Sequence, residues 1–579
     1  MKIFYSFITL ILLGGLLFPQ SNQRVFEKMG KTKLDFDEKF QSSTHDKQVN
    51  DEIKRKPIDH VFIGKMWNAY STQGSYTNQI FTDPYSGLTA VIHRGSREFP
   101  HSGVIVYQVS DDRGFNWSPQ IGPMGSINFQ GRHPNIAISN PAKSNSPVEQ
   151  RICASFPALT TFWYYLVFVT DTAVGSQNYF TTFDSLYYPN DEMFINSKGW
   201  VFTAAPLIEP RIEGSDTIII DLFYSTDGGF NWNKKPLVKK SDINYDYNGT
   251  KGFINNNGIG YIVINAKKPG QDFYTFGYKR TTDDGLTWDS TWTWVNPFNF
   301  PELQGKVHAL NYEIDIVTDI NNYLNFVGTF VDTITPGLNG NTGIYHIYGD
   351  GNTWKANLVS KVNVTHQILP GGLITLNECE IATSYNSGII FIKWADKPQG
   401  EDKYDLFGTY AYYSLSGYYY WYPFSTNTPN INEKFSQMSS FLITNIGVQP
   451  ALMYTIFGNN DSTDLGESEL WFLIWPEPII DVVEDEIMPV VDFRLSQNYP
   501  NPFNNKTRLQ YYIPYEFNGN IEIKVFNLLG EEISTLVNEH KSPGYHYIDF
   551  DGSNLSSGVY IFQLKANQTV KKIKGILLK

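Results

Sequence analysis

Short apolar segments separated by turn residues repeat along most of the chain from His60 onward. The commonest unit is an apolar run, a Gly, Asn or Ser turn, and a second apolar run. Examples are residues 193–202 (MFINSKGWVF) and 253–264 (FINNNGIGYIVI). Tight hairpins need a positive φ at the turn, which Gly and Asn adopt at low cost. The pattern therefore predicts β-hairpins and an all-β fold.

The hairpins recur at a nearly constant spacing. The turns at Gly199, Gly258, Asn322 and Gly388 are 59, 64 and 66 residues apart, and Gly87 stands 112 residues before Gly199. A repeat of about 60 residues built from short strands is typical of a β-propeller, in which each blade is a four-stranded antiparallel sheet.

Counting the turns predicts seven blades. Six blades is the alternative, if the weak unit at 134–180 or the last unit is irregular. The last unit lacks room for four strands, and the apolar segment at 60–64 could supply the missing one. Such closure would leave no exposed sheet edge.

A second repeat lies in phase with the hairpins. The pattern Ser/Thr-x-Asp-x-Gly-x-x-Trp occurs at 110–117 (SDDRGFNW), 225–232 (STDGGFNW) and 281–288 (TTDDGLTW). The Asp and Ser/Thr side chains can hydrogen-bond within a turn, Gly supplies an unusual backbone conformation, and Trp packs between sheets. We therefore predict a structural role for Ser110, Asp112, Gly114, Trp117, Ser225, Asp227, Gly229, Trp232, Thr281, Asp283, Gly285 and Trp288.

These motifs resemble the Asp-box (BNR repeat) of sialidase-type β-propellers, and the resemblance covers roughly residues 58–480. It implies that the boxes lie on the periphery, away from an active site. Sialidases also bind the substrate carboxylate with three arginines, whose planar guanidinium groups suit that task. The usual Arg-Ile-Pro motif is missing here, and no arginine occurs from Thr281 to Phe493. The sequence therefore argues against typical sialidase activity.

Other glycosidases need two carboxylates about 5–10 Å apart. Glu378 and Glu380, in the segment NECEIATSY, are the catalytic candidates. At positions i and i+2 of one strand, both would point to the same face. The alternative is that they line the propeller channel or a solvated face without a catalytic role.

One polar segment has the alternating oxygen ligands of a calcium loop. In DINYDYNGT the alternating residues are Asp242, Asn244, Asp246 and Asn248. However, Tyr247 and Phe253 occupy the positions of the Gly and the terminal Glu of an EF-hand loop. A plain polar loop is therefore the alternative, and we predict neither a metal nor a cofactor.

Targeting patterns occur at both ends of the chain. Residues 1–20 have one Lys followed by an apolar run, which is typical of a secretory signal peptide. A polar leader (21–57) precedes the propeller (58–480), and an acidic linker (481–490) follows it. The alternating segments of 491–579 predict a small immunoglobulin-like β-sandwich.

Four motifs in this last module carry a more specific resemblance. NYPNPFNNKT, FNLLGEE, FDGSNLSSGVY and KKIKGILLK resemble, in this order, the type A C-terminal sorting domain of the type IX secretion system. The resemblance implies passage through the periplasm and export across the outer membrane of a Bacteroidota-type cell. The type IX machinery would be the partner of residues 491–579, and the processed protein would not be an integral membrane protein.

Composition narrows the possible partners. A net charge of −13 disfavours nucleic acid, which needs a basic face. Aromatic residues make up 16% of the chain, and exposed ones on the propeller could stack on sugars. We expect a secreted or surface protein that binds a glycan or a protein without catalysis. The alternative is a secreted glycoside hydrolase or lyase acting at the mouth of the channel.

Overall fold

We analysed a computed structural model of the chain. It describes residues 58–579 except for residues 68–76, 129, 160–164, 189, 245–246, 272–273, 297–298, 304–305, 309–313, 333–342, 364–366, 369–373, 376, 399–402, 415–416, 421–422, 427, 429–430, 432, 445–447, 457–466, 476–493, 496–497, 499–500, 514–518, 542–543 and 568. The predicted signal peptide, leader and linker lie outside the described residues. The chain forms two compact units: unit 1 contains Met1–Tyr413 and Gly417–Ile479, and unit 2 contains Ser414–Ser416 and Ile480–Lys579.

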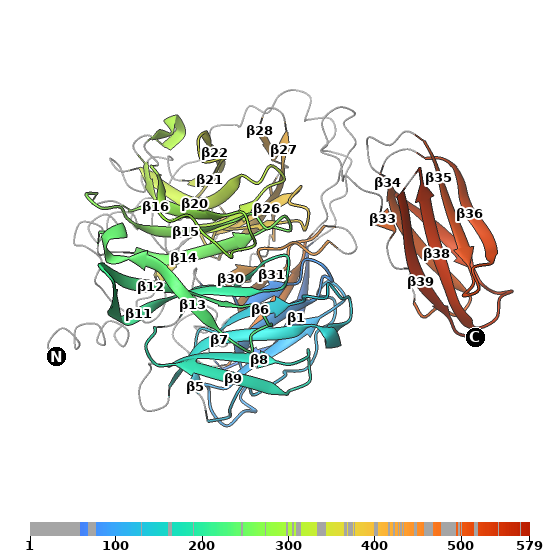
Figure 1. Cartoon of the computed structure of the whole chain (residues 1–579), viewed down its shortest axis with the longest axis horizontal. Helices are drawn as coiled ribbons and strands as arrows, with labels where there is room; N and C mark the ends of the chain where they lie inside the picture. The colour runs from blue at the N-terminus through green and yellow to red at the C-terminus, as the bar shows by residue number, and fades with distance from the viewer. Residues whose placement is uncertain are drawn as a thin grey trace. The chain divides into compact units, whose positions relative to one another are not determined.

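Antiparallel sheets make up unit 1 (Figure 1). Within its described part, seven sheets have three to five strands each, and we name each sheet by the inner strand that it contributes to the ring described below. The β2 sheet contains β2 (Ile80–Thr82), β3 (Thr89–Arg94) and β4 (Ile105–Ser110). The β6 sheet contains β5 (Gln130–Gly131), β6 (Asn135–Ser139), β7 (Arg151–Leu159), β8 (Tyr165–Asp171) and β9 (Tyr179–Asp184). The β10 sheet contains β10 (Phe194–Ile195), β11 (Val201–Glu213), β12 (Asp216–Ser225) and β13 (Asn233–Lys239).

The remaining four sheets follow in chain order. The β14 sheet contains β14 (Tyr247–Ile254), β15 (Gly260–Lys267), β16 (Tyr274–Thr281) and β17 (Thr293–Val295). The β19 sheet contains β18 (Lys306–His308), β19 (Ile314–Thr318), β20 (Leu324–Asp332), β21 (Gly343–Gly349) and β22 (Trp354–Lys361). The β25 sheet contains β25 (Glu380–Thr383), β26 (Ile390–Asp396), β27 (Asp405–Ser414), β28 (Gly417–Tyr420) and β29 (Phe424–Ser425). The β30 sheet contains β30 (Lys434–Met438), β31 (Leu452–Ile456), β32 (Ser468–Ile474) and β1 (Asp59–Met66).

A few short elements connect these sheets. They are a two-stranded ribbon, β23 (Gln367–Ile368) with β24 (Ile374–Thr375), and the 3-10 helices η2 (Pro147–Glu149), η3 (Lys240–Asp242) and η5 (Pro301–Leu303). In the part of the chain that the structure describes, we find no helix with the length and apolar character needed to cross a membrane.

Left-handed residues stand at the predicted hairpin turns. Gly87, Gly199, Gly258 and Asn322 have φ values of 77°, 73°, 75° and 62°. These four predicted turns are confirmed, because each has the positive φ for which Gly and Asn are preferred. The fifth turn differs by one position, because Ser387 (φ 57°) is left-handed there instead of Gly388.

The inner strands form a closed ring. They contact one another in the order β2, β6, β10, β14, β19, β25 and β30, and β30 contacts β2. All residues of β2, β6 and β19 are buried. These strands therefore form part of the core of unit 1, where buried polar side chains need hydrogen-bond partners.

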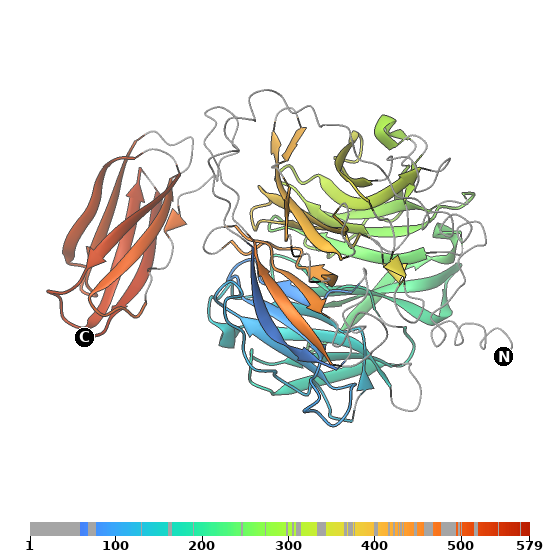
Figure 2. The same ribbon diagram turned by 180° about the vertical axis from the view of Figure 1, so that it is seen from behind.

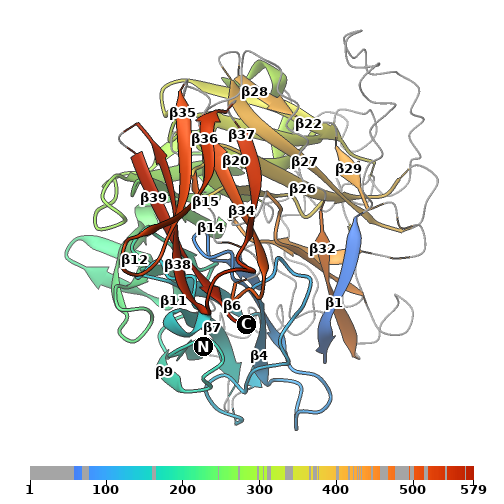
Figure 3. The same ribbon diagram turned by 90° about the vertical axis from the view of Figure 1, so that its right-hand side faces the viewer.

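The N-terminal strand completes the β30 sheet. β1 pairs antiparallel with β32 from Asp59↔Ile474 to Met66↔Ser468, and Figures 2 and 3 show the two strands side by side. The prediction that residues 60–64 supply the missing strand is confirmed. This pairing covers an edge of β32 that would otherwise present unpaired backbone groups.

Two sheets packed face to face form unit 2 (Figure 1). One contains β33 (Arg494–Leu495), β34 (Lys506–Ile513) and β37 (Gly544–Asp551), and the other contains β35 (Asn520–Phe526), β36 (Glu532–His540), β38 (Gly558–Ala566) and β39 (Thr569–Leu577). Leu509 and Phe550 of the first sheet share an apolar cluster with Val525 and Phe562 of the second. The alternation of buried and partly exposed residues in β35 is that of a strand with one face in a core.

Candidate functional site

The three Ser/Thr-x-Asp-x-Gly-x-x-Trp motifs form matching turns after the third strand of their sheets. In residues 225–232, Ser225 Oγ accepts the N–H of Gly229 (2.7 Å) and Asp227 Oδ1 accepts the N–H of Asn231 (3.0 Å). Trp232 Nε1 donates to Gly229 O (3.1 Å). The same bonds recur in residues 110–117 and 281–288. The polar groups of the motif are therefore used to fix the turn.

The motif tryptophans pack on the neighbouring sheet. The Trp232 ring stacks on Phe168 of β8 (centroids 4.2 Å apart), and Trp117 lies 5.3 Å from Phe472 of β32. Gly229 has φ 93°, and a Cβ there would lie 2.1 Å from an oxygen of Thr170. These contacts join each motif turn to the neighbouring sheet.

The motif turns lie beside the hairpin turns, where the inner strands end. Ser197, in the β10–β11 turn, donates to the carboxylate of Asp284 (2.9 Å), and the Asp284 N–H donates to Gly258 O (2.9 Å). A functional site at the start of the inner strands is therefore at the other end of the strands from these motifs.

The calcium-loop candidate is engaged in local contacts. Asp242 Oδ2 accepts the N–H of Lys239 (2.9 Å), which fixes η3, and Asn244 Nδ2 donates to Gln271 O (3.3 Å). Asn248 lies in β14, and Asp246 lies outside the described residues. Among the described residues, no group of three or more His, Cys, Asp or Glu is arranged to hold a metal ion.

The predicted geometry of Glu378 and Glu380 is wrong in one respect. β25 begins at Glu380, and Glu378 has φ 47°, so the two residues are not alternate positions of one strand. The turn nevertheless directs both carboxylates to β30. Glu378 accepts the N–H of Ser436 (2.8 Å), and Glu380 accepts the N–H of Met438 (2.7 Å). Both candidates therefore bind the backbone of the next sheet, and their catalytic role stays a prediction.

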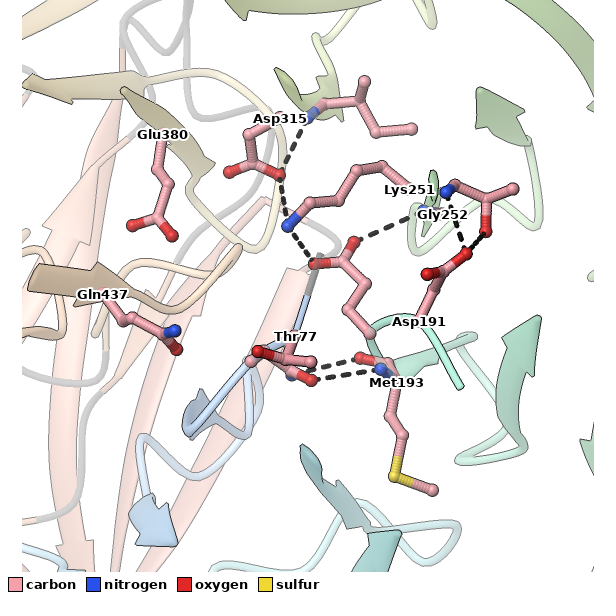
Figure 4. Close-up of polar contacts among 12 residues, drawn as sticks. Thr77, Asp191, Met193, Lys251, Gly252, Asp315, Glu380 and Gln437 are labelled. Atoms are coloured by element: carbon pink, nitrogen blue, oxygen red, sulfur yellow. Dashed lines mark hydrogen bonds and ion pairs between the residues drawn. The ribbon is translucent and has the colours of Figure 1, made fainter. Parts of the chain in front are cut away.

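Buried charges converge where the inner strands begin (Figure 4). Lys251 Nζ lies 2.6 Å from Glu192 Oε2 and 3.8 Å from Asp315 Oδ1, and the three side chains are at most 5% exposed. Lys393 Nζ lies 3.0 Å from Glu380 Oε2. We call Asp191, Glu192, Lys251, Asp315, Glu380 and Lys393 the central cluster.

Polar side chains also join neighbouring inner strands at this end. In five places among the described residues, a side-chain oxygen accepts a backbone N–H of the neighbouring segment. The pairs are Asn135 with Asn78 (2.8 Å), Asp191 with Thr250 (2.9 Å), Asp315 with Ile381 (3.0 Å), Glu380 with Met438 (2.7 Å) and Gln437 with Gln79 (2.7 Å). The central carboxylates thus stabilise the ring as well as providing charge.

The other end of the ring interior is apolar. Phe441 lies 5.1 Å from Phe253 of β14 and 6.3 Å from Phe81 of β2, and the three rings are nearly fully buried. β2 and β14 are not neighbours in the ring, so these rings meet across its interior. We call the end that holds the central cluster the polar end.

Burial raises the pKa of several of these carboxyl groups. The pKa of Asp191 rises to about 7, that of Glu380 to about 7 and that of Glu192 to about 8. Although burial alone would lower it, the pKa of Lys251 is raised by Glu192 and Asp315. The central cluster has four carboxyl groups and two ammonium groups, and burial favours the protonated form of each of these carboxyl groups. Carboxyl groups poised in this way are typical of functional sites, although structural ion-pair networks also show them.

We expect the raised pKa of Asp191 to make unit 1 less stable as pH rises from about 4 to about 7. In that window the folded state holds a proton that the unfolded state has released, so stability falls with pH by up to about 1.4 kcal/mol per pH unit. Asp191→Asn should remove this contribution, because an amide does not titrate. The variant should still fold, because the amide oxygen can accept the N–H of Thr250. Urea unfolding at several pH values measures it, with exposed Asp111→Asn as the control. An unchanged pH slope in Asp191→Asn would contradict the assignment.

Sequence reasoning missed most of the central cluster, although a signal was present. Glu192, Lys251 and Asp315 each stand seven residues before a hairpin turn, at Gly199, Gly258 and Asn322. Superposing the repeats would have placed the three residues at one level of the ring. Lys393 has no such signal, because it stands on a second strand and reaches Glu380 across the β25–β26 pair.

The fold and the polar end define an all-β protein whose sheets surround a buried ionic cluster. Residues 497–579 match the family model of the secretion system C-terminal sorting domain. This match confirms the predicted sorting domain. The chain is exported by type IX secretion to the cell surface or the extracellular space.

Comparison with curated protein sequences gives no match to this chain. Among solved structures, an ulvan lyase of a new polysaccharide lyase family has a TM-score of 0.43 at 10% identity, over 72% of this chain and 96% of that chain. An α-L-arabinofuranosidase from Fusarium graminearum has a TM-score of 0.35 at 10% identity, over 59% and 94%. An endo-arabinase from Bacteroides thetaiotaomicron has a TM-score of 0.29 at 11% identity, over 50% and 94%.

Proposed function

We propose that this exported protein is a seven-bladed, Asp-box β-propeller that binds an extracellular glycan at its polar end. The observation that carries the proposal is the asymmetry of the ring interior. One end concentrates buried charged and amide side chains, whereas the phenylalanine rings of Phe81, Phe253 and Phe441 fill the other. Precisely placed polar groups at one mouth of a rigid ring are what a ligand with many hydroxyl groups requires.

The remaining parts of the chain fit this role. The seven sheets and their closed ring support seven blades, with β1 closing the last. The Asp-box turns stabilise the opposite ends of the strands, and the two-sheet unit 2 serves as an immunoglobulin-like sorting module. Exposure outside the cell brings the polar end into contact with environmental or host polysaccharides.

The binding proposal is tested with the mature chain and a panel of soluble polysaccharides, by isothermal titration calorimetry. Thr77 is partly exposed beside Asn78, whose side chain bridges to Met193 at the polar end. We expect Thr77→Trp to weaken glycan binding at least about tenfold by steric block. The matched control is Asn321→Trp, on an exposed turn at the other end of the ring, which should bind normally. Equal affinity of the two variants would reject the polar end as the binding site.

One observation favours a second candidate function, glycan cleavage. Glu192 and Asp315 face each other across one ammonium group, and a raised carboxyl pKa suits a general acid. Cleavage would appear as release of reducing or unsaturated sugar ends by the wild-type chain. If Glu192→Gln lowers such release by about 100-fold while binding is retained, the protein is an enzyme rather than a binding module.

A further inference from the structure

The closing strand β1 has a side-chain link that reaches beyond its partner strand. The β30 sheet has the strand order β1, β32, β31 and β30, and the β1 backbone pairs with β32 (Figure 3). His60 of β1 nevertheless reaches β31, where its Nδ1 and the Tyr454 hydroxyl group share a hydrogen bond (2.8 Å). The two rings meet edge to face, with centroids 5.7 Å apart. His60 therefore ties the closing strand to the interior of its sheet.

A buried carboxyl group lies next to this link. Glu433, the residue before β30, has a fully buried side chain, and its Oε1 lies 3.9 Å from His60 Nδ1. Its Oε2 accepts the N–H of Leu406 (2.9 Å), and its backbone N–H donates to Tyr404 O (3.1 Å). Leu406 belongs to β27, so Glu433 connects the closing strand with the neighbouring β25 sheet.

Two threonines that follow β29 complete the surroundings of the carboxyl group. Thr426 Oγ1 donates to Glu433 Oε2, and Thr428 Oγ1 donates to Glu433 Oε1 (3.0 Å). The Thr428 N–H donates to Asp405 Oδ1 (3.2 Å), at the start of β27. Three donors from the β25 sheet therefore hold a carboxyl group that lies beside a histidine of the closing strand.

Glu433 lacks a permanently charged partner among the described residues. Within that part of the chain, His60 is the one basic side chain whose nitrogen lies within 4.0 Å of its carboxylate. The other titratable groups that face the pair are Asp59 of β1, Asp405 of β27, Glu469 of β32 and Tyr454 of β31. None of these can supply a positive charge. A proton, on the carboxyl group or on the imidazole, is therefore what neutralises Glu433.

Burial decides where the proton is bound. It raises the pKa of Glu433 to about 7 and lowers the pKa of His60 from its ordinary value. Since an unfolded glutamate titrates near pH 4.3, the contribution of Glu433 to stability is lost as pH rises towards about 7. The lowered pKa of His60 acts in the opposite direction, and only below about pH 6.5. Above neutral pH the pair is thus a buried carboxylate beside a neutral imidazole, which is costly.

We propose that His60 and Glu433 form a proton-dependent latch, which ties the closing strand β1 to the β25 sheet in weak acid and loosens it above neutral pH. The latch acts on closure of the ring, and it does not require a ligand at the polar end. Because the chain is exported, the pH of its surroundings sets the state of the latch.

Hydrogen–deuterium exchange of the full mature chain, followed by mass spectrometry, tests the latch. We expect the protection of the β1 amides to fall about tenfold between pH 6 and pH 8, after correction for the intrinsic effect of pH on exchange. The amides of β8, in the β6 sheet, are the internal reference and should change less. An unchanged protection of β1, or an equal change in β8, overturns the latch.

Glu433→Gln links the pH effect to the carboxyl group. The amide oxygen can still accept the N–H of Leu406, but the side chain cannot ionise. We therefore expect β1 to keep its pH 6 protection at pH 8 in this variant. Glu469→Gln, which removes a neighbouring carboxyl group on β32, is the matched control and should show the wild-type fall. A wild-type fall in Glu433→Gln also overturns the latch.

Two milder substitutions keep the test decisive if Glu433→Gln does not fold. Thr428 is partly exposed, and loss of its donor in Thr428→Val disfavours ionisation of the carboxyl group. The midpoint of the fall should then move about 0.5 to 1 pH unit higher, whereas loss of a purely structural contact would leave it in place. His60→Phe keeps a ring but loses the bond to Tyr454, and should lower the protection of β1 about fivefold at pH 6. An unmoved midpoint in Thr428→Val, or wild-type protection in His60→Phe, overturns the latch.

Discussion

Lys251→Met is expected to lower the free energy of unfolding of unit 1 by about 3 to 5 kcal/mol at pH 7. The substitution keeps the length of the side chain but removes the ammonium group between Glu192 and Asp315. Each of the two groups must then either bury a charge without a cation or take up a proton, and either cost exceeds the value of the pair itself. At pH 5 the deficit should shrink, because burial raises the pKa of both carboxyl groups and they take up protons.

Urea unfolding followed by tryptophan fluorescence measures this effect in the full chain. All 13 tryptophans precede Ile480, so the signal reports unit 1 alone. The matched control is Lys65→Met, which removes a lysine 2.9 Å from Glu467 on the surface, with a side chain 51% exposed. A surface pair of this kind contributes about 0 to 1 kcal/mol. If the two variants lose the same small amount, the central cluster does not hold the ring together.

Removal of β1 is expected to abolish most of the stability of unit 1. A chain that begins at Trp67 loses the whole β1–β32 ladder and the fully or nearly buried side chains of Ile63 and Met66. The two side chains alone account for about 3 to 6 kcal/mol of burial, a large part of the 5 to 15 kcal/mol typical of a domain. The uncovered edge of β32 also invites pairing between molecules.

A chain that begins at Ile58 is the control, because it lacks the same preceding residues but keeps β1. We expect this control to give a cooperative unfolding transition and a monomeric peak in size-exclusion chromatography. The shorter chain should aggregate or unfold at much lower urea. Addition of a synthetic peptide of residues 58–67 should restore part of the transition. Equal stability of the two chains would show that β1 does not close the ring.

Local rules were enough for the strands and their turns. Gly199, Gly258 and Asn322 have the positive φ that their residue types indicate, and the spacing of these turns reflects the sheet repeat. Ser225, Asp227 and Trp232 form the turn that their spacing requires, since every bond in it joins residues within four positions. The sorting domain could also be predicted from the sequence, because four motifs in the expected order identify it.

The polar end depended on contacts that no local rule supplies. Lys251 meets Glu192, 59 residues earlier, and Asp315, 64 residues later, only because the inner strands stand side by side in a ring. Glu378 lies before β25 and has a positive φ, a backbone conformation that a glutamate in a strand-like segment does not predict.

The sequence by itself therefore determined the all-β class, the repeat, the closing strand and the exported fate of this protein. Each of these features depends on residues that are close together in the chain or that recur with a fixed period. The tertiary structure alone decided which charges are buried together and which end of the ring is polar. The buried charges belong to the β10, β14, β19 and β25 sheets, and their side chains meet only because the ring closes.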